Sequence, residues 1–221
     1  MDSNNLSGMG SRFSALFDLD GVIVDTEGLY SGFWQGIGEK CFSDSGFGDR
    51  IKGRTLDNIY AVFFPGQTAL QKEITAALDQ FEHDMPYEYV PGVLEFIADL
   101  QRRGIPRAVV TSSNRKKMEN VYARHPEFKG MFDRIFTGED FSRSKPAPDC
   151  YLLGMKTFGS APESTFIFED SFTGLQSAKG SGGYVVGLAT TNSREAIAPY
   201  CNLVIDDFTQ ITVGFLLDKM A

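Results

Sequence analysis

Two aspartates separated by one residue follow an apolar run near the start of the chain. The run Ser14–Phe17 leads directly into a segment that contains Asp18, Asp20 and Gly21. Consecutive apolar residues are typical of a central strand, so the carboxylates should lie at a strand end, where a glycine permits a sharp turn. Clustered oxygen ligands suit Mg²⁺, but a solvated acidic turn has the same pattern.

Thr111 and Ser112 follow a second candidate strand and precede a helix. A hydroxyl and backbone N–H groups at a helix N-terminus can bind an anion such as phosphate. The alternative is that Thr111 only caps the helix, because serine and threonine are common N-cap residues.

Lys145 lies in the sequence Lys-Pro-Ala-Pro-Asp. The prolines stiffen its backbone, so its ammonium group can act as a fixed charge for a phosphate or for crowded carboxylates. A solvated lysine before a proline-initiated helix is the alternative.

Glu169 and Asp170 end a further candidate strand and repeat the acidic pattern of Asp18 and Asp20. Like charges that converge at one place repel one another, so either a metal ion or Lys145 must compensate them.

Alternating helices and strands would position these residues. Strands are expected at 107–110, 133–137, 164–168, 184–188 and 203–205, with helices between them. Repeated strand and helix units predict a doubly wound, mainly parallel sheet. Ligands of such sheets lie at the carboxyl ends of the strands, where the polar groups above are expected.

The segment from 28 to 88 interrupts this alternation. Its apolar residues recur at helical spacing, beginning with Leu29, Phe33, Ile37 and Cys41. We therefore expect three parts: a flexible tail (1–12), a catalytic core (13–27 and 89–221) and a helical cap (28–88).

Composition narrows the classes of function. The formal net charge of −8 disfavours a broad surface for nucleic acid or anionic membranes, while a local basic pocket for phosphate is compatible with it. The three cysteines have neither the spacing of a metal site nor that of a disulfide framework. We see no signal peptide or bilayer-length apolar run, so we expect a soluble, cytoplasmic monomer without nucleic-acid or membrane partners.

Taken in order, the segments F-D-L-D-G, V-V-T-S-S, K-P-A-P-D and F-E-D-S resemble the four motifs of the haloacid dehalogenase-like (HAD) hydrolase superfamily. The segment D-G-V-I-V-D-T-E, with a helical insert after it, is similar to the β-phosphoglucomutase-like and sugar phosphatase branch. The resemblance implies an α/β fold, with a doubly wound, Rossmann-like parallel-sheet core and a small all-helical cap inserted after the first strand.

The resemblance also implies a role for each motif residue. Asp18 matches the nucleophile that attacks phosphorus, and Asp20 the acid/base that protonates the leaving alkoxide and then activates water. Thr111 and the Ser112 N–H match the hydrogen-bond donors to phosphate. Lys145 matches the charge that steadies the nucleophile and the phosphoryl group.

The implied cofactor is Mg²⁺. Asp170, the Asp18 carboxylate and the Asp20 carbonyl match its ligands, and Glu169 would bind it directly or through water.

In the cap, Lys52, Gly53 and Arg54 form a basic turn before a helix. This turn resembles the loop that selects the substrate in such enzymes, where Lys52 or Arg54 would hold a hydroxyl group or a second anion. A solvated basic loop is the alternative.

The expected function is a Mg²⁺-dependent phosphatase that hydrolyses a small phosphorylated metabolite, such as a sugar phosphate, through an aspartyl-phosphate. A β-phosphoglucomutase-type phosphomutase is the first alternative, but Tyr30 stands ten residues after Asp20, where sugar mutases of this branch commonly have a histidine. The second alternative is a non-catalytic phospho-accepting or phosphate-binding regulatory module. Asp20 and the helical insert argue against it, because a receiver needs neither.

Overall fold

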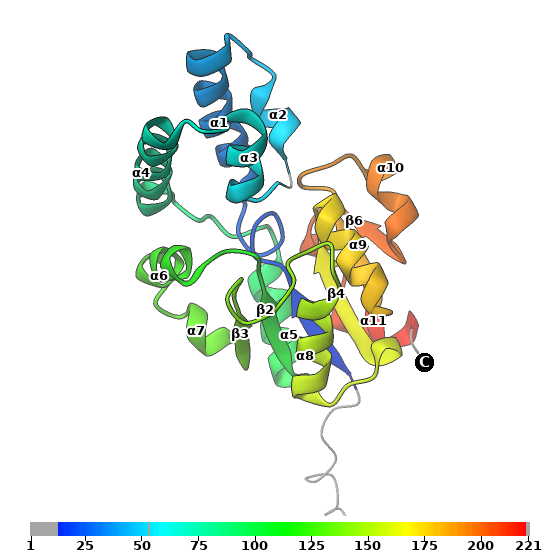
Figure 1. The fold of residues 1–221 in the computed structure, drawn as a ribbon. Helices are drawn as coiled ribbons and strands as arrows, with labels where there is room; N and C mark the ends of the chain where they lie inside the picture. The colour runs from blue at the N-terminus through cyan, green and yellow to red at the C-terminus, as the bar shows by residue number, and fades with distance from the viewer. Residues whose placement is uncertain (1–12, 53, 220–221) are drawn as a thin grey trace, which may run out of the picture.

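Six parallel strands form one sheet in the order β3-β2-β1-β4-β5-β6 (Figure 1). The computed structural model describes residues 13–52 and 54–219, so the expected tail 1–12 and Gly53 lie outside the described residues. β2, β5 and β6 have the expected bounds, while β3 and β4 differ from expectation by one residue at each end. The strands are β1 (Ser14–Phe17), β2 (Arg107–Val110), β3 (Arg134–Phe136), β4 (Thr165–Glu169), β5 (Tyr184–Leu188) and β6 (Leu203–Ile205).

The central position of β1 brings the ends of three strands level. Every residue of β1 is buried, as its unbroken apolar run predicts. Phe17, its last residue, is in register with Val109 of β2 on one side and with Phe168 of β4 on the other. The residues that follow these strands therefore meet at one edge of the sheet.

Helices cover both faces of the sheet. Successive side chains of a strand point to opposite faces. Phe17 therefore belongs to an apolar cluster that includes residues of α5, α6, α7 and α11, while Leu16 belongs to one that includes residues of α8, α9 and α10. None of the helices in the described residues is long and apolar enough to cross a membrane. The helices of the core are α5 (Val93–Arg102), α6 (Arg115–Arg124), α7 (Phe128–Met131), α8 (Asp149–Phe158), α9 (Phe172–Ser181), α10 (Arg194–Ile197) and α11 (Val213–Lys219), with 3₁₀ turns η1 (Pro162–Ser164), η2 (Ala198–Tyr200) and η3 (Phe208–Gln210).

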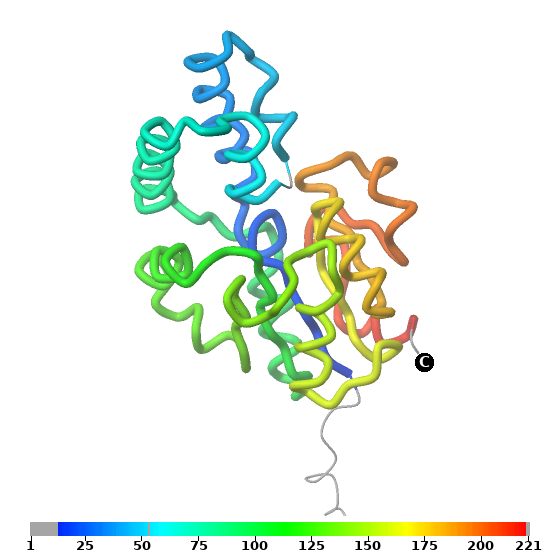
Figure 2. Tube along the Cα trace, in the orientation of Figure 1, coloured from blue at the N-terminus to red at the C-terminus, as the bar shows by residue number. Residues whose placement is uncertain are grey.

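Four helices that follow β1 form a cap over the carboxyl ends of the strands (Figure 1). The cap has its own apolar core, which includes Trp34, Phe47 and Phe64. The chain passes between core and cap twice (Figure 2), and Val24 pairs with Tyr89 in an isolated antiparallel bridge near these crossings. The predicted fold class, a parallel sheet with a helical cap after the first strand, is thus confirmed. The cap helices are α1 (Glu27–Phe42), α2 (Phe47–Ile51), α3 (Leu56–Phe63) and α4 (Thr68–Asp84).

Candidate active site

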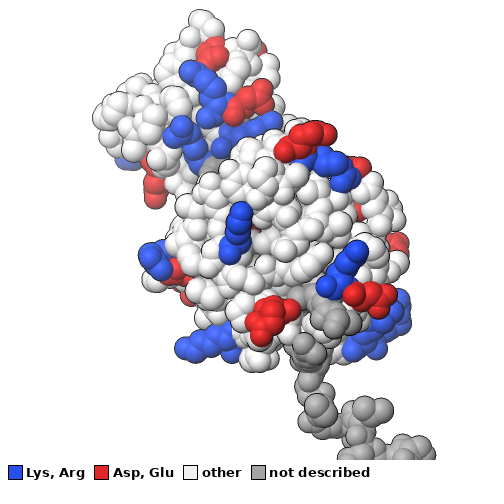
Figure 3. Space-filling view, turned by 90° about the vertical axis from the view of Figure 1, so that its right-hand side faces the viewer, with Lys and Arg blue, Asp and Glu red and all other residues white. Residues whose placement is uncertain are grey.

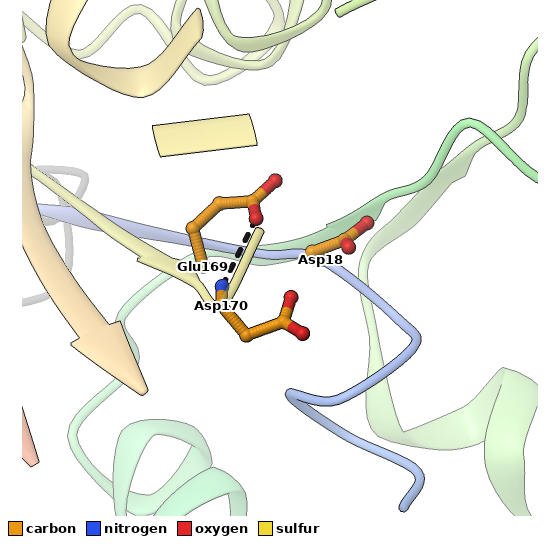
Figure 4. Close-up of side chains that lie close together, drawn as sticks. All are labelled: Asp18, Glu169 and Asp170. Carbon is orange, nitrogen blue, oxygen red and sulfur yellow. Dashed lines mark hydrogen bonds between the residues drawn. The ribbon is translucent and has the colours of Figure 1, made fainter. Parts of the chain in front are cut away.

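Three carboxylates from two neighbouring strands meet beneath the cap. Asp18 follows β1, Glu169 ends β4 and Asp170 follows it (Figure 4). One oxygen of each carboxylate lies within 4.8 Å of the others. This spacing suits a shared cation, because Mg²⁺ binds carboxylate oxygens together with water and phosphate.

The turn after Asp18 depends on Gly21. Its backbone has a φ of +69°, and its N–H donates to the Val24 carbonyl at 2.8 Å. A Cβ atom at this position would lie only 2.1 Å from Asp170 Oδ2. Glycine is therefore required both by the left-handed backbone and by the close approach to the acidic cluster. The turn expected from the sequence is confirmed.

The Lys145 ammonium group lies between two of these acids. It donates to Asp18 Oδ1 at 2.8 Å, to Glu169 Oε1 at 2.6 Å and to the Val110 carbonyl at 3.1 Å. Only 6% of the Lys145 side chain is exposed. The alternative of a solvated lysine is therefore wrong, and Lys145 supplies a fixed positive charge at the strand ends.

Glu169 is fully buried and accepts hydrogen bonds on both oxygens. Besides Lys145, the Tyr151 hydroxyl donates to Oε1 at 2.7 Å. The Asp170 N–H donates to Oε2 at 3.0 Å, and the Ser171 N–H and hydroxyl donate to it at 3.3 Å. Glu169 therefore orients Lys145 and adds negative charge to the cluster.

The loop after β5 holds Asp170 in place. The sequence patterns do not indicate that this loop belongs to the site. The Thr191 hydroxyl donates to Asp170 Oδ2, and the Asn192 side-chain amide donates to the Asp170 carbonyl at 3.0 Å. Thr190 donates to the Gly21 carbonyl at 2.6 Å, which ties the same loop to the turn after Asp18. The loop thus holds both sides of the acidic cluster in place.

The Asp20 side chain accepts four hydrogen bonds apart from the acidic cluster. Lys117 donates to both of its oxygens at 2.6 Å, Thr26 donates to Oδ1 at 2.5 Å and Ser113 donates to Oδ2 at 3.1 Å. The sequence does not indicate Lys117 as a site residue, because it lies in the basic run Arg115-Lys116-Lys117, which resembles a solvated helix face. The available signal was its place beside the apolar Met118 in the first turn of α6.

Thr111 is buried, and Ser112 next to it is exposed. Asn114, not Thr111, caps α6, because its side chain accepts from the Lys117 N–H at 2.9 Å. Thr111 Oγ1 instead accepts from the Ser113 N–H at 3.0 Å, which leaves its hydroxyl proton available to a phosphate oxygen. The capping explanation for Thr111 is therefore wrong.

The cap places basic side chains near its junction with the core (Figure 3). Lys52 pairs with Asp49 at 2.8 Å and lies close enough to Glu27, in the first turn of α1, to stabilise its negative charge. Arg54 is turned toward α3 instead, where it donates to Asn58 at 2.8 Å. The structure thus places Lys52, but not Arg54, toward the acids.

The comparisons with known proteins decide the family. The family described as "Haloacid dehalogenase-like hydrolase" matches residues 15–188, which contain every acid and base of the site described above. The chain belongs to this family.

Relatives and solved structures agree with this assignment. The HAD chain is 29% identical over 205 residues to validoxylamine A 7'-phosphate phosphatase of Streptomyces hygroscopicus subsp. limoneus, covering 89% of this chain and 94% of the relative. It is 30% identical over 212 residues to hexitol phosphatase A of Escherichia coli, and the match covers 90% of this chain and 92% of that relative. A HAD hydrolase of family IA, variant 3, from Entamoeba histolytica has the same fold, with a TM-score of 0.82 at 21% identity over 94% of this chain and 99% of that one.

Structural neighbours also include β-phosphoglucomutases at 20% and 22% identity, which share the fold. The family match and the phosphatase relatives confirm the recognised superfamily. The chain is a HAD-like phosphatase, a phosphoric monoester hydrolase.

The electrostatics of the HAD site separate its carboxylates into two groups. Burial raises the pKa of Asp18 to about 7, although Lys145 opposes this shift. Burial, with the charges of Glu169 and Glu27, raises the pKa of Asp170 well above its ordinary value. Burial acts on Asp20 as well, but Lys117 and the neighbouring hydroxyls outweigh it and lower the pKa of Asp20.

Glu27 is a further site residue that sequence analysis missed. Burial, and then the charge of Asp20, raise its pKa to about 7, although Lys117 and Lys52 oppose this shift. Its position directly after D-G-V-I-V-D-T was the available signal. Glu27 therefore lies between the core acids and the basic part of the cap.

Proposed function

We propose that this HAD phosphatase hydrolyses the monophosphate of a small sugar or polyol, with Mg²⁺ as cofactor and an aspartyl-phosphate on Asp18 as intermediate. The observation that carries the proposal is the position of Lys145 between Asp18 and Glu169, beside a separately held Asp20. The named activities of the validoxylamine phosphate and hexitol phosphatases support this substrate class.

In the first half-reaction, an Asp18 oxygen forms a bond to phosphorus while the bond from phosphorus to the leaving oxygen breaks. Lys117 holds Asp20 as a carboxylate in the free protein, so Asp20 must take up a proton when the substrate binds. It then gives this proton to the leaving oxygen, and an alcohol departs. Thr111 and the Ser112 N–H donate to the phosphate oxygens, and Lys145 neutralises part of the charge that develops on them.

In the second half-reaction, a water oxygen attacks phosphorus and the phosphorus–oxygen bond to Asp18 breaks. Asp20, now a carboxylate, accepts the water proton and so returns to its protonated form. Inorganic phosphate leaves, and Asp18 is regenerated.

The donor set fits Mg²⁺. The Asp18 and Asp170 carboxylates and the Asp20 carbonyl would hold the ion, and Glu169 would join through water. When all three carboxylates are ionised, one ammonium group leaves two of their negative charges uncompensated, and a phosphate would add more. When bound, Mg²⁺ neutralises this charge and stabilises the phosphoryl group in the transition state.

Tyr30 favours a phosphatase over a phosphomutase. A mutase must protect its aspartyl-phosphate from water while a bisphosphate intermediate turns round, and a histidine can couple acid/base readiness to the sugar because it titrates near neutral pH. Tyr30 instead donates to Glu82 at 2.8 Å, and burial raises its pKa well above its ordinary value. A phenol in this state does not exchange protons near neutral pH.

The decisive assay follows phosphate release and isomerisation together. The protein is incubated with Mg²⁺ and a panel of sugar and polyol phosphates, including β-glucose 1-phosphate, with and without a glucose bisphosphate. We expect inorganic phosphate to match substrate loss, independently of the bisphosphate. Bisphosphate-dependent glucose 6-phosphate without phosphate release would establish a mutase. No release from any ester, p-nitrophenyl phosphate included, would favour the regulatory module.

A further inference from the structure

Lys117 is a buried lysine that lies outside the four motifs. It is 5% exposed, and its ammonium group contacts both oxygens of Asp20 at 2.6 Å. Thr26 and Ser113 each add one hydrogen bond to the same carboxylate. Four hydrogen bonds from three directions fix both the plane of the Asp20 carboxylate and the direction of its oxygens.

The cap holds Lys117 from the other side. Its Nζ atom lies 4.5 Å from the centroid of the Tyr30 ring, within the range of a cation–π contact. The Tyr30 hydroxyl donates to Glu82 at 2.8 Å. Since Tyr30 belongs to α1 and Glu82 to α4, one series of contacts connects two cap helices to Asp20 through Lys117.

We propose that Lys117 is a positioning residue that aligns Asp20 for the hydrolysis of the aspartyl-phosphate. The inference rests on the acid/base role of Asp20 in the proposed function. Because one ammonium group bonds both oxygens, it can release one oxygen to a water while it keeps the other, so the carboxylate does not rotate. The water proton then moves to the released oxygen as the water oxygen bonds to phosphorus and the bond to Asp18 breaks.

Loss of this alignment should affect the two half-reactions unequally when p-nitrophenyl phosphate is the substrate. The p-nitrophenolate ion leaves without a proton, so formation of the aspartyl-phosphate does not need Asp20. Hydrolysis of the aspartyl-phosphate still needs it as a base. A side chain with only a structural role would slow both half-reactions together.

The test is rapid mixing of Lys117→Met with p-nitrophenyl phosphate and Mg²⁺. We expect a stoichiometric burst of p-nitrophenol, then a kcat lowered by about 10–100-fold, part of the 10²–10⁴-fold that a general base typically contributes. The value of kcat/KM should stay close to that of the unaltered protein, because it reports the first half-reaction. Ser113→Ala, which removes one neutral hydrogen bond to Asp20, should show the same pattern more weakly.

Lys116→Met is the matched control. Lys116 is the neighbouring lysine of α6, and it also contacts the cap, through an exposed ion pair with Asp79 at 2.6 Å. We expect the kinetics of Lys116→Met to be unchanged. An effect of Lys117→Met would then not be explained by the general loss of a contact between α6 and the cap.

Equal losses of kcat and kcat/KM without a burst in Lys117→Met would overturn the inference, as would unchanged kinetics of that variant. If Lys117→Met does not fold, Ser113→Ala decides by the same criteria. Absence of phosphate release by the unaltered protein would instead overturn the proposed function.

Discussion

Asp18 and Asp20 are separated by one residue, yet their surroundings shift their pKa values in opposite directions. Asp18 shares Lys145 with Glu169 and lies beside Asp170, so negative charge is in excess around it. Asp20 forms an ion pair with Lys117 and accepts from two hydroxyl donors. The turn at Gly21 creates this separation by sending the two side chains to different partners. The two aspartates should therefore respond differently to the same substitution.

Asp18→Asn should abolish phosphate release while the folded protein keeps its stability. The amide cannot attack phosphorus, and the substitution removes one negative charge from a crowded cluster. Lys145 retains Glu169 as its partner. Phosphate release and thermal unfolding of the purified variant are the measurements. Residual turnover near that of the unaltered protein would contradict the nucleophile assignment.

Asp20→Asn should lower turnover by about 10²–10⁴-fold, the usual contribution of a general acid/base. It should also destabilise the protein by roughly 2–4 kcal/mol, because Lys117 loses the partner of a largely buried ion pair. Unfolding in urea measures this loss. If Asp18→Asn and Asp20→Asn were equally stable, the described separation of their surroundings would be wrong.

The residues that follow strands were predictable from the sequence, and those that support them were not. Asp18, Thr111, Lys145 and Asp170 stand next to strands or prolines, whose positions local patterns reveal. Lys117 supports the site from within a helix, where a basic run resembles a solvated face. Its burial depends on where the cap and α6 meet, and this is a tertiary contact that local sequence patterns do not encode.

At the scale of elements, the loop between α2 and α3 offers two basic side chains with different surroundings. Arg54 bonds Asn58 and lies 5.6 Å from the centroid of the Phe63 ring, so it is part of the outer surface of the cap. Among the described residues, Lys52 pairs with an exposed aspartate, and it lies close enough to Glu27 to stabilise its charge. Lys52 is therefore better placed to meet a substrate, while a role for Arg54 stays a prediction from the sequence.

Lys52→Ala should lower kcat/KM for the best sugar or polyol phosphate by about 10–100-fold, as expected for the loss of a charged hydrogen bond. It should leave p-nitrophenyl phosphate nearly unaffected, because an aryl group offers no hydroxyl or second anion to Lys52. Arg54→Ala is the matched variant and should change neither substrate by more than about twofold. A larger loss in Arg54→Ala would reverse the assignment.

Elements were predictable where one kind of pattern dominates. Mainly apolar runs predicted the bounds of β2 and β5, and helical spacing predicted a helical cap after the first strand. The short helix α2 was not predicted, because glycines and polar residues interrupt the helical spacing there. The loop after β5 was not predicted as part of the site. Thr191 and Asn192 contact Asp170 only because β5 lies beside β4 in the sheet, and strand order is not readable from one segment at a time.

At the scale of the whole molecule, buried carboxyl groups lie close together where the core and the cap meet. Burial raises the pKa values of Asp18 and Glu27 to about 7, and that of Asp170 is raised as well. These groups ionise near pH 4 in the unfolded chain. Between about pH 4 and pH 7 the folded state therefore binds more protons than the unfolded state, so these groups contribute less stability as pH rises.

Mg²⁺ should restore this lost stability, and its effect should grow with pH. The ion needs ionised carboxylates, so protons compete with it at pH 5 and no longer do so at pH 8. At 100 times its Kd, Mg²⁺ should raise Tm at pH 8 by roughly 5–10 °C, from about 2.7 kcal/mol of binding linkage in a chain of this size. Thermal unfolding at pH 5, 6.5 and 8, at constant ionic strength, measures the shift. Asp170→Asn should remove most of it, while Asp206→Asn, which alters an exposed acid paired with Arg194, should keep it. A Mg²⁺ shift that is equal at pH 5 and pH 8, or that survives in Asp170→Asn, would show that the ion binds somewhere other than the acidic cluster.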